Sequence, residues 1–152
     1  AGRRRAGAAW GGRARAMSRG YLLVRVEGRP YGLPLDGVLE VDDLTEVLDA
    51  PRVVPAVRGL TTARGRLVPL VHLGALLGDR AAPDERGRTA VLVRLGARQV
   101  ALEVDDADEV VRETPLPVPR GQSLPWAAGV ARPRAGGLVP ILDLEALEDR
   151  ML

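Results

Sequence analysis

The chain has 152 residues and no cysteine, which excludes disulfides, thiolate metal sites and a cysteine nucleophile. Its length suits one ordinary domain, and the core must be mainly aliphatic because phenylalanine is absent and aromatic residues make up 3% of the chain. The net charge of +2 is uneven, because residues 1–20 hold six arginines and no acid, whereas the remaining 132 residues hold 16 arginines against 20 acids.

The first twenty residues are rich in glycine, alanine and arginine without apolar periodicity, which predicts a disordered tail over residues 1–20. No apolar run of signal-peptide length follows Arg5. The longest apolar stretch, Leu67–Leu77, is far shorter than the roughly 20 residues that span a bilayer. Arg3–Arg5 would suit an anionic membrane or a nucleic acid, but the acidic remainder argues against nucleic acid. We therefore expect neither membrane insertion nor nucleic-acid binding.

The first half of the remaining chain predicts short strands and one short helix. Tyr21–Leu35 has two apolar runs around Gly28, which is typical of a hairpin, and Gly37–Asp43 follows as a third strand. After a proline-bearing loop, Arg64–Leu77 is expected to be a closing strand that runs into a helical turn. Residues Ala81–Arg88 are mostly small and charged, and they form a connection.

The second half repeats this order of elements. Thr89–Val111 predicts two strands and a third short element, Pro115–Pro125 is a proline-rich loop, and Ala135–Leu147 again predicts a strand and a helical turn. Offsets of 69 residues and then 71 residues superimpose the halves. Matched pairs are Leu23 and Leu92, Arg29 and Arg98, Asp36 and Asp105, Glu40 and Glu109, Pro69 and Pro140, and Leu76 and Leu147. We expect two modules, at about 21–80 and 88–140.

Short strands with glycine and proline turns favour small closed barrels over a sandwich with long edges. A five-stranded barrel of about 60 residues buries so little apolar surface that it would be only marginally stable alone. Two such barrels packed together gain a shared core, and they leave a groove between them. The predicted fold class is therefore mainly β.

Catalytic and metal-binding chemistry is excluded by the residue types present. A nucleophile would have to be built from Ser123 and the single histidine, His72, with no signature of an orienting group or oxyanion hole. The acidic run Asp105–Glu109 lacks the glycine and distal glutamate of a calcium loop, and one histidine cannot form a zinc site. No phosphate-binding glycine loop is present. We expect no enzyme activity, no metal and no cofactor.

His72 and Asp143 occupy the same place in the two halves, each just before a short helix. A lone histidine between Val71 and Leu73 would suit a ligand, a pH sensor or a partly buried structural role. The exchange with aspartate favours a polar residue that caps the following helix.

Several short motifs follow one another in a fixed order along the chain. The first half contains Val38-Leu39-Glu40-Val41, Gly59-Leu60, Arg64-Gly65, Leu67-Val68-Pro69 and Leu73; the second contains Val104-Asp105, Glu109-Val110, Pro119, Gly129-Val130 and Leu142-Asp143-Leu144. In this order and spacing the chain, from Tyr21 to about Asp149, resembles the CheW-like chemotaxis adaptor (coupling protein) family. It departs from the family pattern at Thr62-Ala63, where the family favours Asn-Leu, and at His72, where it usually has aspartate.

This resemblance implies a single domain over residues 21–149, made of two intertwined five-stranded SH3-like β-barrels with short helices, whose C-terminal segment returns to the first barrel. It implies a non-enzymatic adaptor in chemotaxis signal transduction. Its partners would be the regulatory domain of a CheA-type histidine kinase and the cytoplasmic tip of chemoreceptors, in arrays beneath the inner membrane. The alternative is a CheW-like module of a larger chemosensory kinase or receiver-containing protein.

The resemblance also implies the site residues. The family's polar pair corresponds to Glu40 and Arg64, which would form either a salt bridge within the barrel or an interface pair. The partner-binding residues expected beside them are Val38, Gly59, Leu60 and Gly65, with Val104 and Val110 on the face between the barrels. Alternation leaves open whether Val41 and Val110 contact a partner or fill the cores.

Overall fold

The computed structural model describes residues 20–51, 54–118, 124–132 and 137–151. The predictions for residues 1–19, Ser123 and Pro119 lie outside these ranges. The strands are β1 Tyr21–Val26, β2 Arg29–Pro34, β3 Val38–Asp43, β4 Val57–Ala63, β5 Arg66–His72, β6 Thr89–Leu95, β7 Arg98–Val104, β8 Asp106–Val111, β9 Ala127–Ala131 and β10 Val139–Leu142. A 3₁₀ turn, η1, covers Leu35–Gly37, and the helices are α2 Leu73–Gly78 and α3 Leu144–Arg150.

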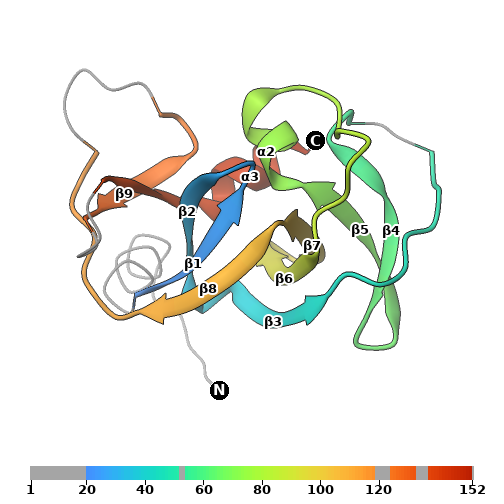
Figure 1. Cartoon of the computed structure of the whole chain (residues 1–152), viewed down its shortest axis with the longest axis horizontal. Helices are drawn as coiled ribbons and strands as arrows, with labels where there is room; N and C mark the ends of the chain where they lie inside the picture. The colour runs from blue at the N-terminus through green and yellow to red at the C-terminus, as the bar shows by residue number, and fades with distance from the viewer. Residues whose placement is uncertain (1–19, 52–53, 119–123, 133–136, 152) are drawn as a thin grey trace.

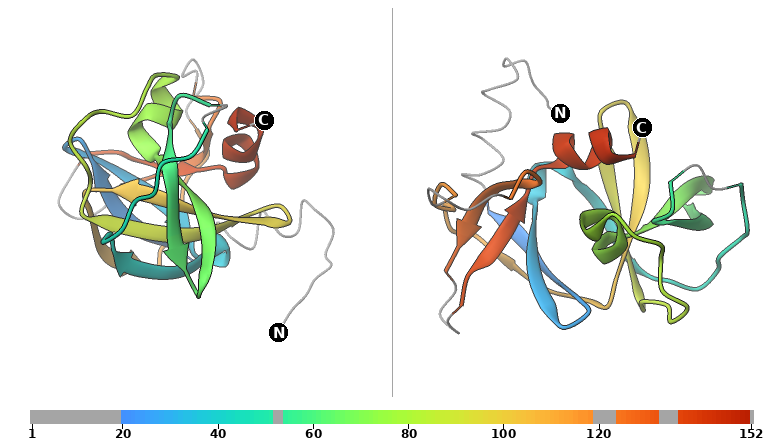
Figure 2. Two further views of the ribbon diagram at one scale, coloured as in Figure 1. Left: turned by 90° about the vertical axis from the view of Figure 1, so that its right-hand side faces the viewer. Right: turned by 90° about the horizontal axis from the view of Figure 1, so that it is seen from above.

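The ten strands form two five-stranded sheets, as the sequence predicted. The first sheet has the order β8-β1-β2-β10-β9, and the second has the order β3-β6-β7-β5-β4. The strand hairpins β9–β10 and β4–β5 lie at opposite ends of the molecule (Figure 2), and α2 and α3 lie side by side near its middle (Figure 1).

Strand exchange between the two halves is reciprocal. The hairpin β1–β2 is completed by β8, β9 and β10 from the second half, and β6–β7 is completed by β3, β4 and β5 from the first. The modules expected over about 21–80 and 88–140 therefore do not coincide with the sheets. The stretch Arg64–Leu77 supplies β5 to the second sheet, beside β7, rather than closing a barrel around β1 and β2. The C-terminal strand β10 pairs with β2 in the first sheet.

Two-residue turns join the tightest hairpins. Glu27 and Gly28 have φ of 53° and 81°, and Arg64 and Gly65 have φ of 54° and 74°. Positive φ at both central residues matches the right-handed twist of the flanking strands, and a glycine at the second position adopts it at little cost. Both turns are therefore encoded locally by an X-Gly pair.

Buried side chains fall into one large cluster and two small ones. In β1, Leu22, Val24 and Val26 join the large cluster, which includes residues from both sheets and both helices, whereas Tyr21 and Leu23 face a small cluster within the first sheet. The second sheet has an equivalent small cluster of Val68, Leu70, Leu92 and Ala101. Because alternate residues of β1 enter different cores, this strand is buried on both faces.

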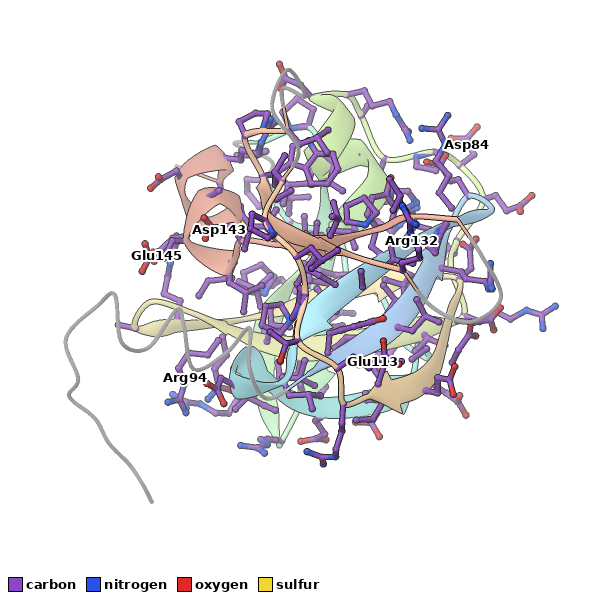
Figure 3. All side chains as sticks on the ribbon, turned by 90° about the vertical axis from the view of Figure 1, so that its left-hand side faces the viewer. Asp84, Arg94, Glu113, Arg132, Asp143 and Glu145 are labelled. Atoms are coloured by element: carbon purple, nitrogen blue, oxygen red, sulfur yellow. The ribbon has the colours of Figure 1, made fainter. Side chains whose placement is uncertain are left out.

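Both predicted helix caps are confirmed. The Nδ1 atom of His72 accepts a hydrogen bond from the backbone N–H of Ala75 at 3.0 Å, at the start of α2. Asp143 accepts hydrogen bonds from the backbone N–H groups of Glu145 and Ala146 at 3.1 and 3.4 Å, at the start of α3, where Figure 3 labels it. Each cap satisfies backbone donors that the first helical turn leaves without a partner.

Candidate functional site

Arg64 and Glu40 form an ion pair at the surface of the second sheet. Arg64 Nε lies 2.6 Å from Glu40 Oε2, and Arg64 Nη2 donates to the carbonyl oxygen of Leu39 at 3.4 Å. Glu40 belongs to β3, and Arg64 lies in the turn after β4. Strands β3 and β4 are the two edge strands of the sheet. The pair therefore holds the two edges close together, as in a barrel.

Charge in this pair is maintained by its surroundings. A hydrogen bond from Arg64, followed by one shared with Asp42, holds the pKa of Glu40 below its ordinary value. The same contact with Glu40 raises the pKa of Asp42. Because 47% of the Arg64 side chain and 32% of the Glu40 side chain remain exposed, both charged groups are accessible to a partner.

The valines that the sequence could not assign are on the surface. Val41 is 43% exposed and Val110 is 48% exposed, so the alternative in which they fill the cores is wrong. Val41 directly follows Glu40 in β3, and Val110 occupies the matched position in β8. Each sheet thus presents one valine to solvent from an edge strand.

Two of the predicted partner-binding residues are not at the surface. Val104 is 1% exposed and packs in the large cluster. Gly59 is buried beneath the carbonyl oxygen of Leu48, which lies where a Cβ atom would be. Both residues have structural roles. Val104 fills the core at the end of β7, and Gly59 lets the segment around Leu48 pair with β4.

The remaining predicted residues are partly accessible. Val38 and Leu60 are half-buried, and Gly65 is exposed at the tip of the turn. Val38 packs against the large cluster, and the backbone of Leu60 exchanges two hydrogen bonds of 2.8 Å with Leu48. The structure therefore brings Glu40, Arg64 and Gly65 together at one end of the second sheet, and it places Val110 in the other sheet.

Large exposed apolar side chains come in repeat-related pairs among the described residues. The offsets of 69 and 71 relate Val41 to Val110 and Leu67 to Leu138, whereas Leu48 and Leu116 are equivalent because each forms an isolated bridge to the outer strand of a β hairpin. Their exposed fractions range from 42% to 58%. Apart from the two valines, the sequence analysis did not predict that these side chains are exposed, although each lies beside a glycine, a proline or a charged residue. Exposed apolar side chains near an accessible ion pair suit the binding of another protein.

A buried ion pair in the second sheet was also missed. Arg58 Nε donates to Glu103 Oε1 at 2.6 Å and Nη2 donates to Oε2 at 3.0 Å, a bidentate contact. Glu103 is fully buried and also accepts from the backbone N–H of Gly87 at 2.7 Å. The only hint in the sequence is an acid between Leu102 and Val104, within an apolar strand. Because the buried charged groups of Arg58 and Glu103 have hydrogen-bond partners, this ion pair is a structural element.

The described residues contain no arrangement suited to metal chemistry. Within residues 20–51, 54–118, 124–132 and 137–151, no group of three or more histidine, cysteine or acidic side chains converges on one point. The described helices α2 and α3 have six and seven residues, and neither has the length or apolar character of a membrane span.

Comparison with known proteins agrees with this architecture. The model of the CheW-like domain family matches residues 20–150. Among solved structures, the scaffolding protein TtCheW from Thermoanaerobacter tengcongensis is similar, with a TM-score of 0.73 and 19% sequence identity. The match covers 86% of this chain and 92% of that one. No curated protein sequence matched.

Proposed function

The chain belongs to the CheW-like domain family, and from this membership we propose that it is a non-enzymatic chemotaxis adaptor that couples chemoreceptors to a CheA-type histidine kinase. The family match spans nearly all described residues, and the similar fold is that of a scaffolding protein. The proposed location is the cytoplasm, at receptor arrays beneath the inner membrane.

The observation that carries the proposal is the exposed Arg64–Glu40 pair. An exposed ion pair contributes only about 0–1 kcal/mol to stability, because water and salt screen it and ordering two long side chains costs entropy. Such a pair is therefore dispensable for folding, whereas the planar guanidinium of Arg64 offers a fork that fits a partner carboxylate.

Apolar side chains beside this pair supply the other requirement of a protein interface. Val41 follows Glu40 in β3, and Leu67 lies two residues beyond Gly65 in β5, where it is 57% exposed. An apolar helix face would contact the exposed side chain of Leu67, and a carboxylate of the same helix would bind Arg64. The cytoplasmic tip of a chemoreceptor is proposed to supply such a helix, and the kinase regulatory domain a second surface.

Substitution of Arg64 tests the proposal. We expect Arg64→Ala to lower the free energy of unfolding by less than about 1 kcal/mol and to raise the Kd for a receptor tip peptide or for a kinase regulatory domain about tenfold or more. Affinity would be measured by isothermal titration calorimetry and stability by urea unfolding.

The matched control is Arg94→Ala. Arg94 is an exposed arginine of the same sheet, in β6, and Figure 3 shows it at the surface. The Arg94→Ala substitution should leave both stability and affinity unchanged. A large loss of stability in Arg64→Ala with unchanged affinity would instead assign the ion pair to the fold alone.

Two other functions are separated by the same binding assay. Deleting residues 1–16 should leave kinase and receptor binding intact, whereas salt-sensitive RNA binding that disappears with these residues would indicate a nucleic-acid-binding protein. If the chain is a module of a larger chemosensory protein, an antibody raised against it should detect a longer polypeptide in cells that produce it.

A further inference from the structure

A cleft separates the β1–β2 turn from α2, away from the Arg64–Glu40 pair in sequence and in sheet. Its volume is ≈ 480 Å³, which lies within the roughly 300–1,000 Å³ typical of small-molecule sites. The cleft is lined by Val26, Glu27, Arg29, Tyr31, Gly74, Leu77, Gly78, Arg80 and Trp126. Three separate parts of the chain therefore meet around it.

Aromatic side chains are concentrated at this cleft. Tyr31 and Trp126 are two of only four tyrosine and tryptophan residues in a chain without phenylalanine. Their rings form an edge-to-face pair with centroids 5.9 Å apart and an interplanar angle of 66°. Both are half-buried, so part of each ring is accessible from the cleft. Such surfaces bind planar rings through stacking and edge contacts.

The cleft also presents positive charge. Arg80 lines it and is paired with Glu27, so that these two charges offset each other. Arg29 is exposed, and its side chain has no hydrogen bond or ion pair to any residue that the structure describes. The cleft therefore has one uncompensated guanidinium, which can bind a carboxylate or phosphate with two hydrogen bonds.

The matched region of the other half retains the arginine, as Arg98, but lacks the aromatic pair and the glycines of the helix. By the offset of 69, Tyr31 corresponds to Val100. Trp126 corresponds in structure to Ala56, because their carbonyl oxygens accept from the backbone N–H groups of Asp143 and His72, respectively. On the helices, Gly74, Leu77 and Gly78 of α2 correspond to Glu145, Glu148 and Asp149 of α3.

The side chain of Glu148, in α3, occupies the region of the second half that corresponds to the cleft. The carboxyl carbon of Glu148 lies 2.9 Å from where a Cβ on Gly96, in the β6–β7 turn, would be. The helix of one half therefore contributes acidic side chains where the helix of the other half contributes glycine and leucine beside an aromatic pair. Duplication alone would not produce this difference, because both copies share the same strand order.

We propose that the cleft is a binding site for a small aromatic anion, a planar ring that bears one carboxylate or phosphate group. The ring contacts Trp126 and Tyr31, and the anionic group contacts Arg29. Leu77 and Val26 supply an apolar wall. This site is independent of the proposed adaptor function, because it shares no residue with the Arg64–Glu40 surface.

The test uses the full chain labelled with ¹⁵N and four probes. Indole-3-acetate and adenosine monophosphate each carry a ring and an anion, whereas indole lacks the anion and acetate lacks the ring. We expect either anionic ring compound to shift the amide signals of Gly74 and Gly78 and the indole signal of Trp126, with a Kd below about 1 mM. Which of the two binds more tightly distinguishes a carboxylate from a phosphate ligand.

Two variants assign the contacts. Arg29→Gln should weaken binding of the anionic ring compound about tenfold, the effect of losing a charge-assisted hydrogen bond. Its repeat counterpart Arg98→Gln is the matched control and should leave the Kd unchanged, because Arg98 does not line the cleft. Trp126→Leu should weaken both indole-3-acetate and indole.

Three results would overturn the proposal. These are the absence of shifts at the cleft signals up to about 10 mM of every probe, equal affinity for indole and indole-3-acetate, and equal weakening by Arg29→Gln and Arg98→Gln. Because both substitutions are at exposed positions, unfolding of the variant does not account for lost binding, and a circular dichroism spectrum confirms this.

Discussion

The two sheets have equivalent strand orders but different interiors. In the second sheet, β4 and β7 contribute the buried Arg58–Glu103 pair. At the matched positions the first sheet has Ala128 and Pro34, which carry no charge. Duplicated strands thus preserve the backbone arrangement, whereas the side chains within each sheet have diverged. The second sheet is held partly by a buried ion pair, and the first by aliphatic and aromatic packing.

Exchange of strands makes the sheets depend on each other despite this difference. Neither half of the chain contains all five strands of a sheet, because each hairpin is completed by strands from the other half. The large apolar cluster also includes residues from both sheets. Damage to either interior should therefore unfold the whole domain in one transition.

The largest effect is expected from Glu103→Ala. This substitution leaves Arg58 buried without its carboxylate and removes the acceptor of the Gly87 N–H. Breaking a buried ion pair from one side typically costs about 3–5 kcal/mol. Urea unfolding followed by circular dichroism should show this loss, and the two sheets should still unfold together.

A double variant shows whether the second sheet needs its charge. Combining Glu103→Leu with Arg58→Met replaces the pair with apolar side chains, as in the first sheet, and should recover most of the stability lost in Glu103→Ala. If Glu103→Ala alone costs less than about 1 kcal/mol, the pair is solvated and the contrast between the interiors is wrong.

A smaller effect is expected in the first sheet from Gly32→Ala. Gly32 in β2 matches Ala101 in β7, but a Cβ at Gly32 would clash with Ile141 Cδ1 and lie 2.8 Å from Tyr21 Cδ2. Overpacking of this kind costs about 1–3 kcal/mol, measured by urea unfolding.

The packing explanation makes a further prediction about Tyr21, whose repeat counterpart is Ala90. In a Tyr21→Ala background the tyrosine ring is gone and Ile141 Cδ1 can move into the space that it leaves, so the added cost of Gly32→Ala should fall below about 1 kcal/mol. An equal cost in both backgrounds would assign the effect to Ile141 or the backbone rather than to the tyrosine ring.

Much of the fold was predictable because the repeat consists of local sequence signals, namely apolar runs, turn residues and capping residues. The hairpins follow from apolar runs around X-Gly turns, and the caps His72 and Asp143 follow from their place before short helices. The exchange of strands between sheets was not predictable from these signals. Hydrophobic alternation determines which face of a strand is buried, but it does not determine which strand is its neighbour.

The candidate site was predictable only in part, for a similar reason. The motif around Arg64 and Glu40 indicated a polar pair, and the structure places the two side chains in contact. The same motifs included Val104 and Gly59, which are buried. A short motif does not separate residues that are retained for packing from residues that contact a partner. The cleft near Trp126 gave no signal, because its walls come from distant segments.

Removal of the cap of α3 is expected to have a moderate effect. Asp143→Ala leaves the backbone N–H groups of Glu145 and Ala146 without their acceptor and should cost about 0.5–2 kcal/mol. The conservative variant Asp143→Asn keeps the acceptor oxygen and should lose only a fraction of that amount. A cost of Asp143→Asn equal to that of Asp143→Ala would indicate that charge, rather than capping, is what the helix requires.

The smallest effect at neutral pH is expected at the cap of α2, where the two halves differ most in chemistry. His72 accepts through Nδ1, so its cap requires the neutral ring. Burial lowers the pKa of His72, although Glu103 and then Glu27 oppose the shift and Arg58 and Arg80 add to it. Asparagine caps as well as aspartate, so His72→Asn should change the free energy of unfolding by less than about 1 kcal/mol at pH above 7.

Acidification should reveal the difference. Because the pKa of His72 is lower in the folded chain than in the unfolded chain, the unfolded chain takes up a proton first as the pH falls below about 6.5. The contribution of His72 to stability is therefore complete above that pH and is lost on descending toward the folded pKa. Urea unfolding between about pH 7.5 and 5 should show a steeper loss of stability for the native chain than for His72→Asn. Parallel pH profiles would mean that the ring is protonated as readily in the folded chain as in the unfolded one, and the hydrogen bond to Nδ1 would then contribute nothing to the pH dependence of stability.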